Sequence, residues 1–450
     1  MRRLAILLLT LAIAGTAAAQ TQVRWYVGLG AGSDVGVIPV QEEFVANFNA
    51  SQDDIELILE IVDNDQAYDV LATQIAAGNP PDIVGPVGIR GRNAFPGIFA
   101  DLTPYIDATD YDLSDFDPAL VEVYNVEGEG QIGIPFAVFP SYITYNKTLF
   151  DEAGLPYPPH EYGAPYTTWE GETVDWDLAA MRDVGMLLTV DANGFDAAMP
   201  EFDINNVIQW GFGEQWTDLR GRLSKFGAGT FVDENGDAII PAHWAQGAQW
   251  LHDAMWVDGW IPNAPYAGSD FLAAGDFVSS GNVGMVHTHL WYQGCCMAAF
   301  EDAWDLAAMP AGLTGVPVAK LHGDTFGITA ASPNKEAAFE VLVAMFEPEN
   351  MITLSEIYGG MPARESLAGS YIESFGENNF PDRDVDWSVV TASLGYADSP
   401  SHEGPLPAFR DAEQLYIAFD QRLNNEADLD VASELALLQA ELQLLFDSVR

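Results

Sequence analysis

Positive charge is scarce in this chain of 450 residues. Lysine and arginine together number 17, against 67 aspartates and glutamates, which gives a formal net charge of −50. The four lysines stand at positions 147, 225, 320 and 335. Because a field of this sign repels nucleic acids and anionic membrane surfaces, we expect neither as a partner. Acidic side chains also fall near one another by chance at this density, so a pair of carboxylates does not by itself identify a site.

The acidity has two interpretations. Strong net charge keeps proteins soluble in salt, which favours adaptation to a saline exterior. Capture of a cationic solute is the rival interpretation. Acidic residues occur along the whole chain rather than in one segment, and this distribution favours the first.

Long apolar segments are also scarce. The longest, from Leu4 to Ala14, is shorter than the ~20 residues that a membrane-spanning helix needs. It follows Arg2 and Arg3 and leads to Ala17-Ala18-Ala19 before Gln20. This order is typical of a secretory signal peptide, residues 1–19, cleaved after Ala19, and a buried N-terminal helix is the alternative. Loss of the two arginines shifts the formal charge from −50 to −52. Gln20 rather than cysteine begins the mature chain, so we expect a soluble periplasmic protein without a lipid anchor.

Cysteine occurs only twice, at the adjacent positions Cys295 and Cys296. Exported proteins usually oxidise their cysteines. Adjacent Cα atoms lie about 3.8 Å apart, whereas disulfides usually join Cα atoms about 4.4 to 6.8 Å apart. A vicinal disulfide therefore needs a distorted turn, which Gly294 could ease. Two buried free thiols remain the alternative.

The remaining composition is that of a folded protein. Hydrophobic residues make up 48% of the chain, which is enough for complete cores. The length corresponds to two or three domains at about 150 residues each.

Apolar periodicity predicts an α/β fold. Alternation at Val23, Trp25 and Val27 indicates a strand, and a helical spacing follows from Val37 to Phe48. The order strand, helix, strand, helix, strand favours a parallel sheet. The later elements of this order are Ile55 to Val62, Tyr68 to Ala77 and Ile83-Val84; further strands are expected at Ile143 to Tyr145 and Val283 to His289.

Two helices nearer the end are predicted from capping and periodicity. Ser332 is a good N-cap, Pro333 suits the first turn and Glu336 complements the helix N-terminus. An amphipathic helix is expected to end the chain, with its apolar stripe at Val431, Leu435, Leu438, Leu442 and Leu445.

Several segments resemble, in the same order, those of the ABC-importer extracellular solute-binding proteins of family 1, which include maltose-binding protein. Each match is short, and their ordered occurrence along most of the chain carries the resemblance. They are YDVLATQIAAGNPPDIV from Tyr68, DLTPYI from Asp101, GEGQIGIPFAVFPSYITYNKTLF from Gly128, Asp270 to Trp291, ITAASPNKEAAFEVL within Asp324 to Phe346, and GGMPAR from Gly359. The regions from His160 to Phe226 and from Phe375 to Pro407 depart from the family pattern.

The resemblance implies a two-lobed periplasmic-binding-protein fold with discontinuous α/β lobes and a hinge-flanked ligand cleft. The N-terminal lobe would comprise residues 20–137 and 310–347, and the C-terminal lobe residues 138–309 and 348–450. A carbohydrate would bind between the lobes and close them by a hinge motion. The closed form, a monomer without a cofactor, would then deliver the sugar to the permease subunits of the importer.

Sugar rings bind to aromatic platforms, with carboxylates, amides and arginine pairing their hydroxyls. Trp291 stands where the resembling segment places a sugar-stacking tryptophan. Tyr26 was preferred to Trp25 on the first strand, because alternate residues point to opposite faces. The remaining predicted ligand-binding residues are Glu42, Asp82, Tyr142, Tyr292, Gly359, Gly360 and Arg364, with Trp210, Trp216, Trp260 and Asp324 as weaker candidates. A bridged Cys295-Cys296 would present a flat, polarizable face at the cleft wall.

Metal and enzyme interpretations are less favoured. His287-Thr288-His289 offers two imidazoles, too few for a structural zinc site, and DENGD at 233–237 lacks the later glutamate of an EF-hand and is first a hairpin turn. We therefore predict no metal. A glycoside hydrolase would need two carboxylates at a set separation, which this sequence can neither identify nor exclude, and a nucleophile elbow, a P-loop and an H-E-x-x-H motif are all lacking.

Overall fold

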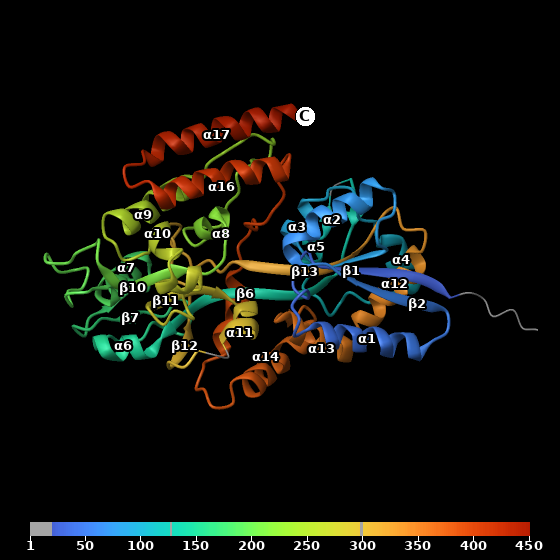
Figure 1. Cartoon of the computed structure of the whole chain (residues 1–450), viewed down its shortest axis with the longest axis horizontal. Helices are drawn as coiled ribbons and strands as arrows, with labels where there is room; N and C mark the ends of the chain where they lie inside the picture. Colours follow the sequence, from blue (N-terminus) through green and yellow to red (C-terminus); the bar gives the residue numbers. More distant parts are fainter. Residues whose placement is uncertain (1–19, 127, 298–299) are drawn as a thin grey trace, which may run out of the picture.

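The computed structural model describes residues 20–126, 128–297 and 300–450. The predicted signal peptide, residues 1–19, and its cleavage after Ala19 lie outside the described residues. One twisted sheet runs through the long axis of the molecule, and helices cover it on both sides (Figure 1). Within the described part, no helix is long and apolar enough to cross a membrane.

The first part of the sheet confirms the predicted parallel α/β arrangement. Strand β1 (Thr21–Val27) pairs in parallel with β2 (Ile55–Ile61) on one side and with β3 (Ile83–Gly88) on the other. Helices α1 (Ile38–Ser51) and α2 (Asn64–Ala76) connect these strands. They cover opposite faces of the sheet (Figure 1), so side chains on both faces of β1 are buried.

Strand β6 (Pro135–Asn146) crosses between two halves of the molecule, and all of its residues are buried. Its first half pairs with β13 (Leu321–Ile328), from Pro135 to Pro140. Its second half pairs with β11 (Val283–His289) and β12 (Trp304–Ala307). The two halves therefore share strand β6, as a hinge between two lobes requires.

The second half contains β10 (Val207–Glu214), which pairs in parallel with β11, and the short edge strand β9 (Val190–Asp191). The strand order is β2-β1-β3-β13-β6-β11-β10-β9. Helices α7 (Leu178–Leu188), α9 (Ala242–Trp256), α16 (Phe409–Asn425) and α17 (Val431–Ser448) belong to this half (Figure 1). The other elements are α3 (Ile89–Asn93), α4 (Thr103–Thr109), α5 (Pro118–Val123), β4 (Asn125–Val126), β5 (Gly130–Gln131), α6 (Lys147–Ala153), β7 (Tyr166–Thr167), β8 (Thr173–Val174), α8 (Leu219–Ser224), α10 (Ala264–Ala267), η1 (Asp270–Gly275), α11 (Leu290–Cys296), α12 (Lys335–Met345), α13 (Pro348–Tyr358), β14 (Met361–Pro362), α14 (Glu365–Asn379), α15 (Ser388–Ser393) and η3 (Leu394–Tyr396).

The predicted division into residues 20–137 plus 310–347 and 138–309 plus 348–450 stays a prediction. Two contacts bear on its second boundary. The N–H of Leu313 donates to the carbonyl of Phe226, and the N–H of Ala319 donates to the carbonyl of Tyr396. These contacts favour placing the residues that precede β13 with the C-terminal lobe.

The two helix predictions near the end differ in accuracy. The C-terminal helix is confirmed, and its stripe from Val431 to Leu442 is buried. The N-cap of α12 is Asn334 rather than Ser332, so that prediction was wrong by two residues. The Ser332 hydroxyl accepts a hydrogen bond from the N–H of Asn334 and donates one to Asp82. Its partners therefore lie outside the helix.

A buried ionic network holds the end of β10. Glu214 contacts Lys225 of the segment after α8, Lys320 at 3.4 Å and His287 of β11 at 3.1 Å. His287 reaches on to the Ser141 hydroxyl of β6 at 2.9 Å. The side chains of both lysines are fully buried, so half of the lysines in the chain converge on this carboxylate.

The carboxyl of Glu214, at the centre of this network, stays ionised. Burial opposes ionisation of Glu214, but Lys225 and Lys320 outweigh it and hold the pKa of the carboxyl well below its usual value. Burial lowers the pKa of Lys225 to about 8, against the attraction of Glu214. Burial and the charge of Lys320 lower the pKa of His287 to about 4, so this imidazole is neutral near pH 7.

We expect Glu214→Gln to destabilise the protein strongly, because two buried ammonium groups would lose their only common counter-charge among these contacts. Removing one partner of a buried ion pair typically costs about 3 to 5 kcal/mol. Guanidinium unfolding, compared with the exposed Glu172→Gln as a control, measures the difference. A loss below about 1 kcal/mol would contradict the role of the network.

Candidate functional site

The carboxyl ends of parallel strands meet at the junction of the two lobes. In open α/β sheets, ligands bind just outside these ends. Strand β10 ends at Glu214 and is followed by Trp216, while β11 ends at His289 and is followed by Trp291. The ends of β1 and β3 point toward the same junction from the other lobe (Figure 1).

The two tryptophans form a parallel aromatic stack. The rings of Trp216 and Trp291 lie 5.7 Å apart at an interplanar angle of 6°. His289 continues the stack behind Trp291, at 5.3 Å and 11°. His289 ends β11 and Trp291 stands in the first turn of α11, whereas Trp216 follows the end of the neighbouring strand β10. We call Trp216, Trp291 and His289 the indole shelf.

Trp216 forms the exposed end of the indole shelf. Its side chain is 50% exposed, although apolar rings of this size are usually covered. Its backbone φ of +37° lies in the left-handed region, which is an outlier for a bulky residue. Strain of this kind gathers at functional sites, where the surroundings hold it. Gln215 supplies that restraint, because its N–H donates to the carbonyl of His287 and its side chain accepts from the N–H of Phe277.

A glycine-containing loop after β1, residues 28–33, contacts the end of helix α13, which in turn contacts the indole shelf. Gly359, the C-cap of α13 at φ +68°, lies so close to Trp291 that an added Cβ would stand 3.3 Å from the Trp291 Cα. The preceding Tyr358 contacts Gly32, where an added Cβ would stand 3.0 Å from the ring. Gln41 fixes this loop by donating to the Gly32 carbonyl and accepting from the Tyr358 hydroxyl. Segments from both lobes therefore meet beside the shelf.

Cys295 and Cys296 are joined by a disulfide within helix α11. They follow Trp291 by one helical turn. Cys295 is exposed and Cys296 is half-buried. Gly294 packs against Gly359, where an added Cβ would meet the Gly359 Cα at 3.1 Å, so a glycine is needed between the shelf and the disulfide.

Tyr292 supports the indole shelf from behind. Its residue surface is fully buried, and its ring stands edge-on to Trp216 at 5.5 Å. Its hydroxyl hydrogen-bonds Asp276 and lies 3.3 Å from the Ser279 hydroxyl. Burial and the bond to Asp276 raise the pKa of the phenol, so the hydroxyl stays protonated as a donor. As placed, Tyr292 orients the tryptophans rather than facing a solute.

Three predicted ligand-binding residues are used within the N-terminal half. Tyr26 is fully buried and its hydroxyl donates to the Ala67 carbonyl of α2 at 2.7 Å. Asp82 accepts from the N–H of Arg24 at 2.8 Å and from Ser332, at the start of β3 rather than at its carboxyl end. Arg364 pairs with Asp115 at 3.2 Å and bonds the Tyr111 hydroxyl. These placements disagree with the prediction that their side chains contact a solute.

The other predicted residues divide similarly. Tyr142 lies at the middle of β6 and is fully buried. Glu42 is exposed, just past the first turn of α1. Gly360 packs against Phe139, where an added Cβ would come within 2.6 Å of the ring. Of the predicted residues, Trp291 belongs to the indole shelf, and Tyr292 and Gly359 pack against it. Trp216, only a weaker candidate from the sequence, is the most exposed member of the shelf. No strand was expected before Trp216 from the sequence, and a strand signal at 207–214 would have raised its rank.

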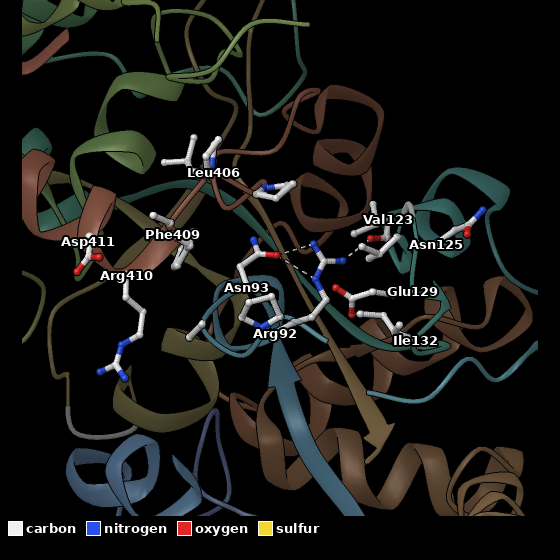
Figure 2. Close-up of a pocket in the computed structure, with 16 residues that line it drawn as sticks. Arg92, Asn93, Val123, Asn125, Glu129, Ile132, Leu406, Phe409, Arg410 and Asp411 are labelled. Carbon is white, nitrogen blue, oxygen red and sulfur yellow. Dashed lines mark hydrogen bonds between the residues drawn. The ribbon is translucent and has the colours of Figure 1, made fainter. Parts of the chain in front are cut away.

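A separate cavity of about 730 Å³ lies elsewhere between the lobes. Figure 2 shows Arg92, Asn93 and Glu129 of the N-terminal half facing Leu406, Phe409 and Arg410 of the C-terminal half. Arg92 hydrogen-bonds Asn93 and the Val123 carbonyl. This cavity contains none of the predicted sugar-binding residues and no exposed aromatic face, so we place the candidate site at the indole shelf.

The two motifs weighed for metal binding have other partners in the structure. His287 bonds Glu214 and Ser141, as expected for a hydrogen-bonding strand histidine. In residues 233–237 the N–H of Gly236 donates to the Asp233 carbonyl and the N–H of Asp233 donates to the Asp237 carbonyl. This segment is the predicted turn.

The fold and the site between its lobes define a protein that captures a solute between two α/β lobes. Residues 37–352 match the bacterial extracellular solute-binding protein family, and the chain belongs to this family. It is therefore the solute-binding component of an ABC transporter, and the family locates it outside the cytoplasm.

Among curated relatives, a binding protein of Brucella abortus (strain 2308) is 26% identical over 349 residues, covering 73% of this chain and 74% of the relative. An arabinooligosaccharide-binding protein of Halalkalibacterium halodurans is 24% identical over 257 residues, covering 56% of this chain and 51% of the relative.

Solved structures share the fold across almost the whole chain. An ABC substrate-binding protein of Listeria monocytogenes in complex with cycloalternan has a TM-score of 0.71 at 20% identity, covering 94% of this chain and 98% of that one. UgpB of Mycobacterium tuberculosis in complex with glycerophosphocholine has a TM-score of 0.69 at 16% identity, covering 95% and 99%.

We expect thiol titration of the denatured, unreduced protein to detect no free thiol, and two after reduction, because Cys295 and Cys296 pair with each other. Cys295→Ser should expose one free thiol without reduction. Two free thiols in the untreated wild type would show that the cysteines are not bridged.

Proposed function

We propose that the chain captures a carbohydrate, a mono- or oligosaccharide, on the indole shelf and delivers it to the permease subunits of an ABC importer. The observation that carries this proposal is the half-exposed Trp216 ring stacked on Trp291 where two parallel strands end. A pyranose or furanose ring has apolar C–H faces that pack on such a ring face, and burying them is favourable at about 25 cal/mol per Å².

Several features support a sugar over other solutes. Two of the similar proteins are named for binding oligosaccharides, an arabinooligosaccharide and cycloalternan. The disulfide lies one helical turn beyond Trp291 and would extend the apolar floor of the site. The nearby backbone of Gly28 to Ser33 offers N–H and C=O groups for the hydroxyls of the sugar.

A polar solute with a quaternary ammonium group is the second candidate. Indole faces attract cations, the chain is strongly acidic, and one of the similar structures holds glycerophosphocholine. Polyols, polyamines and peptides are tested alongside sugars, because each class would contact the indole shelf differently.

The remaining parts of the proposal concern the mature protein. It is a periplasmic monomer, released from its signal peptide after Ala19, and it does not catalyse a reaction on its ligand. Recovery of a bound glycoside intact after overnight incubation tests the last point, and its consumption would favour a hydrolase instead.

A thermal-shift panel identifies the ligand class. A ligand present at 100 times its Kd should stabilise the protein by about 2.7 kcal/mol and raise its Tm. We expect mono- or oligosaccharides to do so. A response only to glycerophosphocholine, polyamines or peptides would overturn the sugar assignment.

We expect Trp291→Ala to weaken binding of the responding ligand by tenfold or more, because burial of an aromatic side chain contributes about 1.5 to 3 kcal/mol. Trp216→Ala should act in the same direction. Trp169→Ala is the matched control, since Trp169 is 46% exposed but lies in the β7–β8 turn. Calorimetric titration measures the Kd values, and unchanged affinity in Trp291→Ala with intact folding would refute the shelf.

A further inference from the structure

Three metal-ligating side chains converge where the C-terminal half meets strand β13. His322, His402 and Glu403 each offer one ligand atom within 4.8 Å of the others. His322 belongs to β13, whereas His402 and Glu403 belong to the segment between η3 and α16. None of them contributes to the indole shelf.

His402 is prepared as a metal ligand by a second carboxylate. Its Nδ1 lies 2.7 Å from Asp398 Oδ2, which also accepts from the His402 N–H. Asp398 Oδ1 accepts from the N–H of Leu321, so the carboxylate is fixed to the start of β13. With Nδ1–H donated to Asp398, the lone pair of His402 lies on Nε2. A carboxylate that orients a histidine in this way is typical of zinc sites.

Two of the candidate ligand atoms lack hydrogen-bond partners within the described structure. His402 Nε2 and Glu403 Oε2 are both buried, and neither makes a hydrogen bond within the described residues. The His402 side chain is only 2% exposed. Burying such groups unpaired is costly, and a bound cation would satisfy both. Glu403 Oε1 lies 3.2 Å from His322 Nδ1.

A third imidazole stands beside the group. His289 Nε2 lies 3.1 Å from His322 Nε2, and the two rings meet edge-on at a centroid distance of 4.5 Å. His322 also stands edge-on to His402 at 4.8 Å. Three imidazoles and one carboxylate thus come together from β11, β13 and the 398–404 segment.

We propose that His322, His402 and Glu403 bind a divalent transition-metal ion, with Zn²⁺ as the best fit, and that Asp398 positions His402. Two histidines and one glutamate are a common zinc ligand set that leaves a coordination position open. Imidazole favours zinc and copper over Mg²⁺ and Ca²⁺, which prefer oxygen ligands.

The ion would join two segments at the lobe junction, β13 and residues 398–404. The Glu403 carbonyl accepts from the Asn93 side chain of α3 at 2.7 Å, and the Gly404 carbonyl accepts from Arg220 of α8 at 3.0 Å. The 398–404 segment therefore reaches both lobes. An ion bound between this segment and β13 would hold the two together.

Because the protein surface is acidic, adventitious cation binding by surface carboxylates competes with the proposed site. The experiment therefore saturates these surface carboxylates first. Purified protein without a polyhistidine tag is stripped with EDTA and kept in a large excess of Mg²⁺. Zn²⁺ is then titrated against a chromophoric chelator, and bound metal is counted by mass spectrometry. We expect one tightly held Zn²⁺ per chain, and visible absorption bands of a low-coordinate site when Co²⁺ replaces it.

Variants locate the ion. His402→Gln and Glu403→Gln should each weaken Zn²⁺ binding at least tenfold, and Asp398→Asn should weaken it about 10- to 100-fold. The control is His243→Gln on α9, because that imidazole bonds the Ala228 carbonyl away from the group. Glu403→Gln keeps the shape of its side chain and therefore tests the site if His402→Gln fails to fold. Failure of the wild type to retain Zn²⁺ in Mg²⁺, or equal binding by the wild type and Glu403→Gln, would overturn the proposal.

Discussion

The indole shelf depends on the buried carboxylate of Glu214. This residue ends β10 directly before Gln215 and Trp216, and it binds two lysines and His287 of the neighbouring strand. His287 in turn hydrogen-bonds Ser141 of β6. One charge centre thus fixes the relative positions of β10, β11 and the crossing strand. Glu214 is thus one of the carboxylates of this acidic chain whose surroundings give it a structural role.

The position of the shelf follows from this restraint. Trp216 keeps a left-handed backbone and a half-exposed ring, which is an arrangement that the chain would relax if the end of β10 could move. Trp291 is held from the other side by Gly359, which lacks a side chain where the two backbones approach. The candidate site is therefore built on the C-terminal half beside a loop of the N-terminal half, as the proposed closure of the lobes on a solute requires.

The same junction concentrates histidines. His287 and His289 lie on β11, and His322 lies on β13. His287 is neutral and serves the Glu214 network, whereas His322 faces His402 and Glu403. The sequence pattern around positions 287 to 289 pointed to strand histidines with hydrogen bonds. It could not show that two residues from a segment more than 100 positions later complete a group of metal-ligating side chains.

Local periodicity determined the parallel strands β1 to β3, the intervening helices and the C-terminal helix, because each has one dominant packing face or a buried run. Ordered family motifs predicted the two lobes and placed Trp291. What the sequence could not determine was which residues face the cleft. Alternation along the first strand favoured Tyr26 over Trp25 as a cleft residue, but helices cover both faces of a parallel sheet, so both side chains are buried. The placement of Asp82, Arg364 and Trp216 depends on partners far along the chain, which are Ser332, Asp115 and Trp291 respectively. Solute contact depends on such long-range packing, and only the tertiary structure brings those residues together.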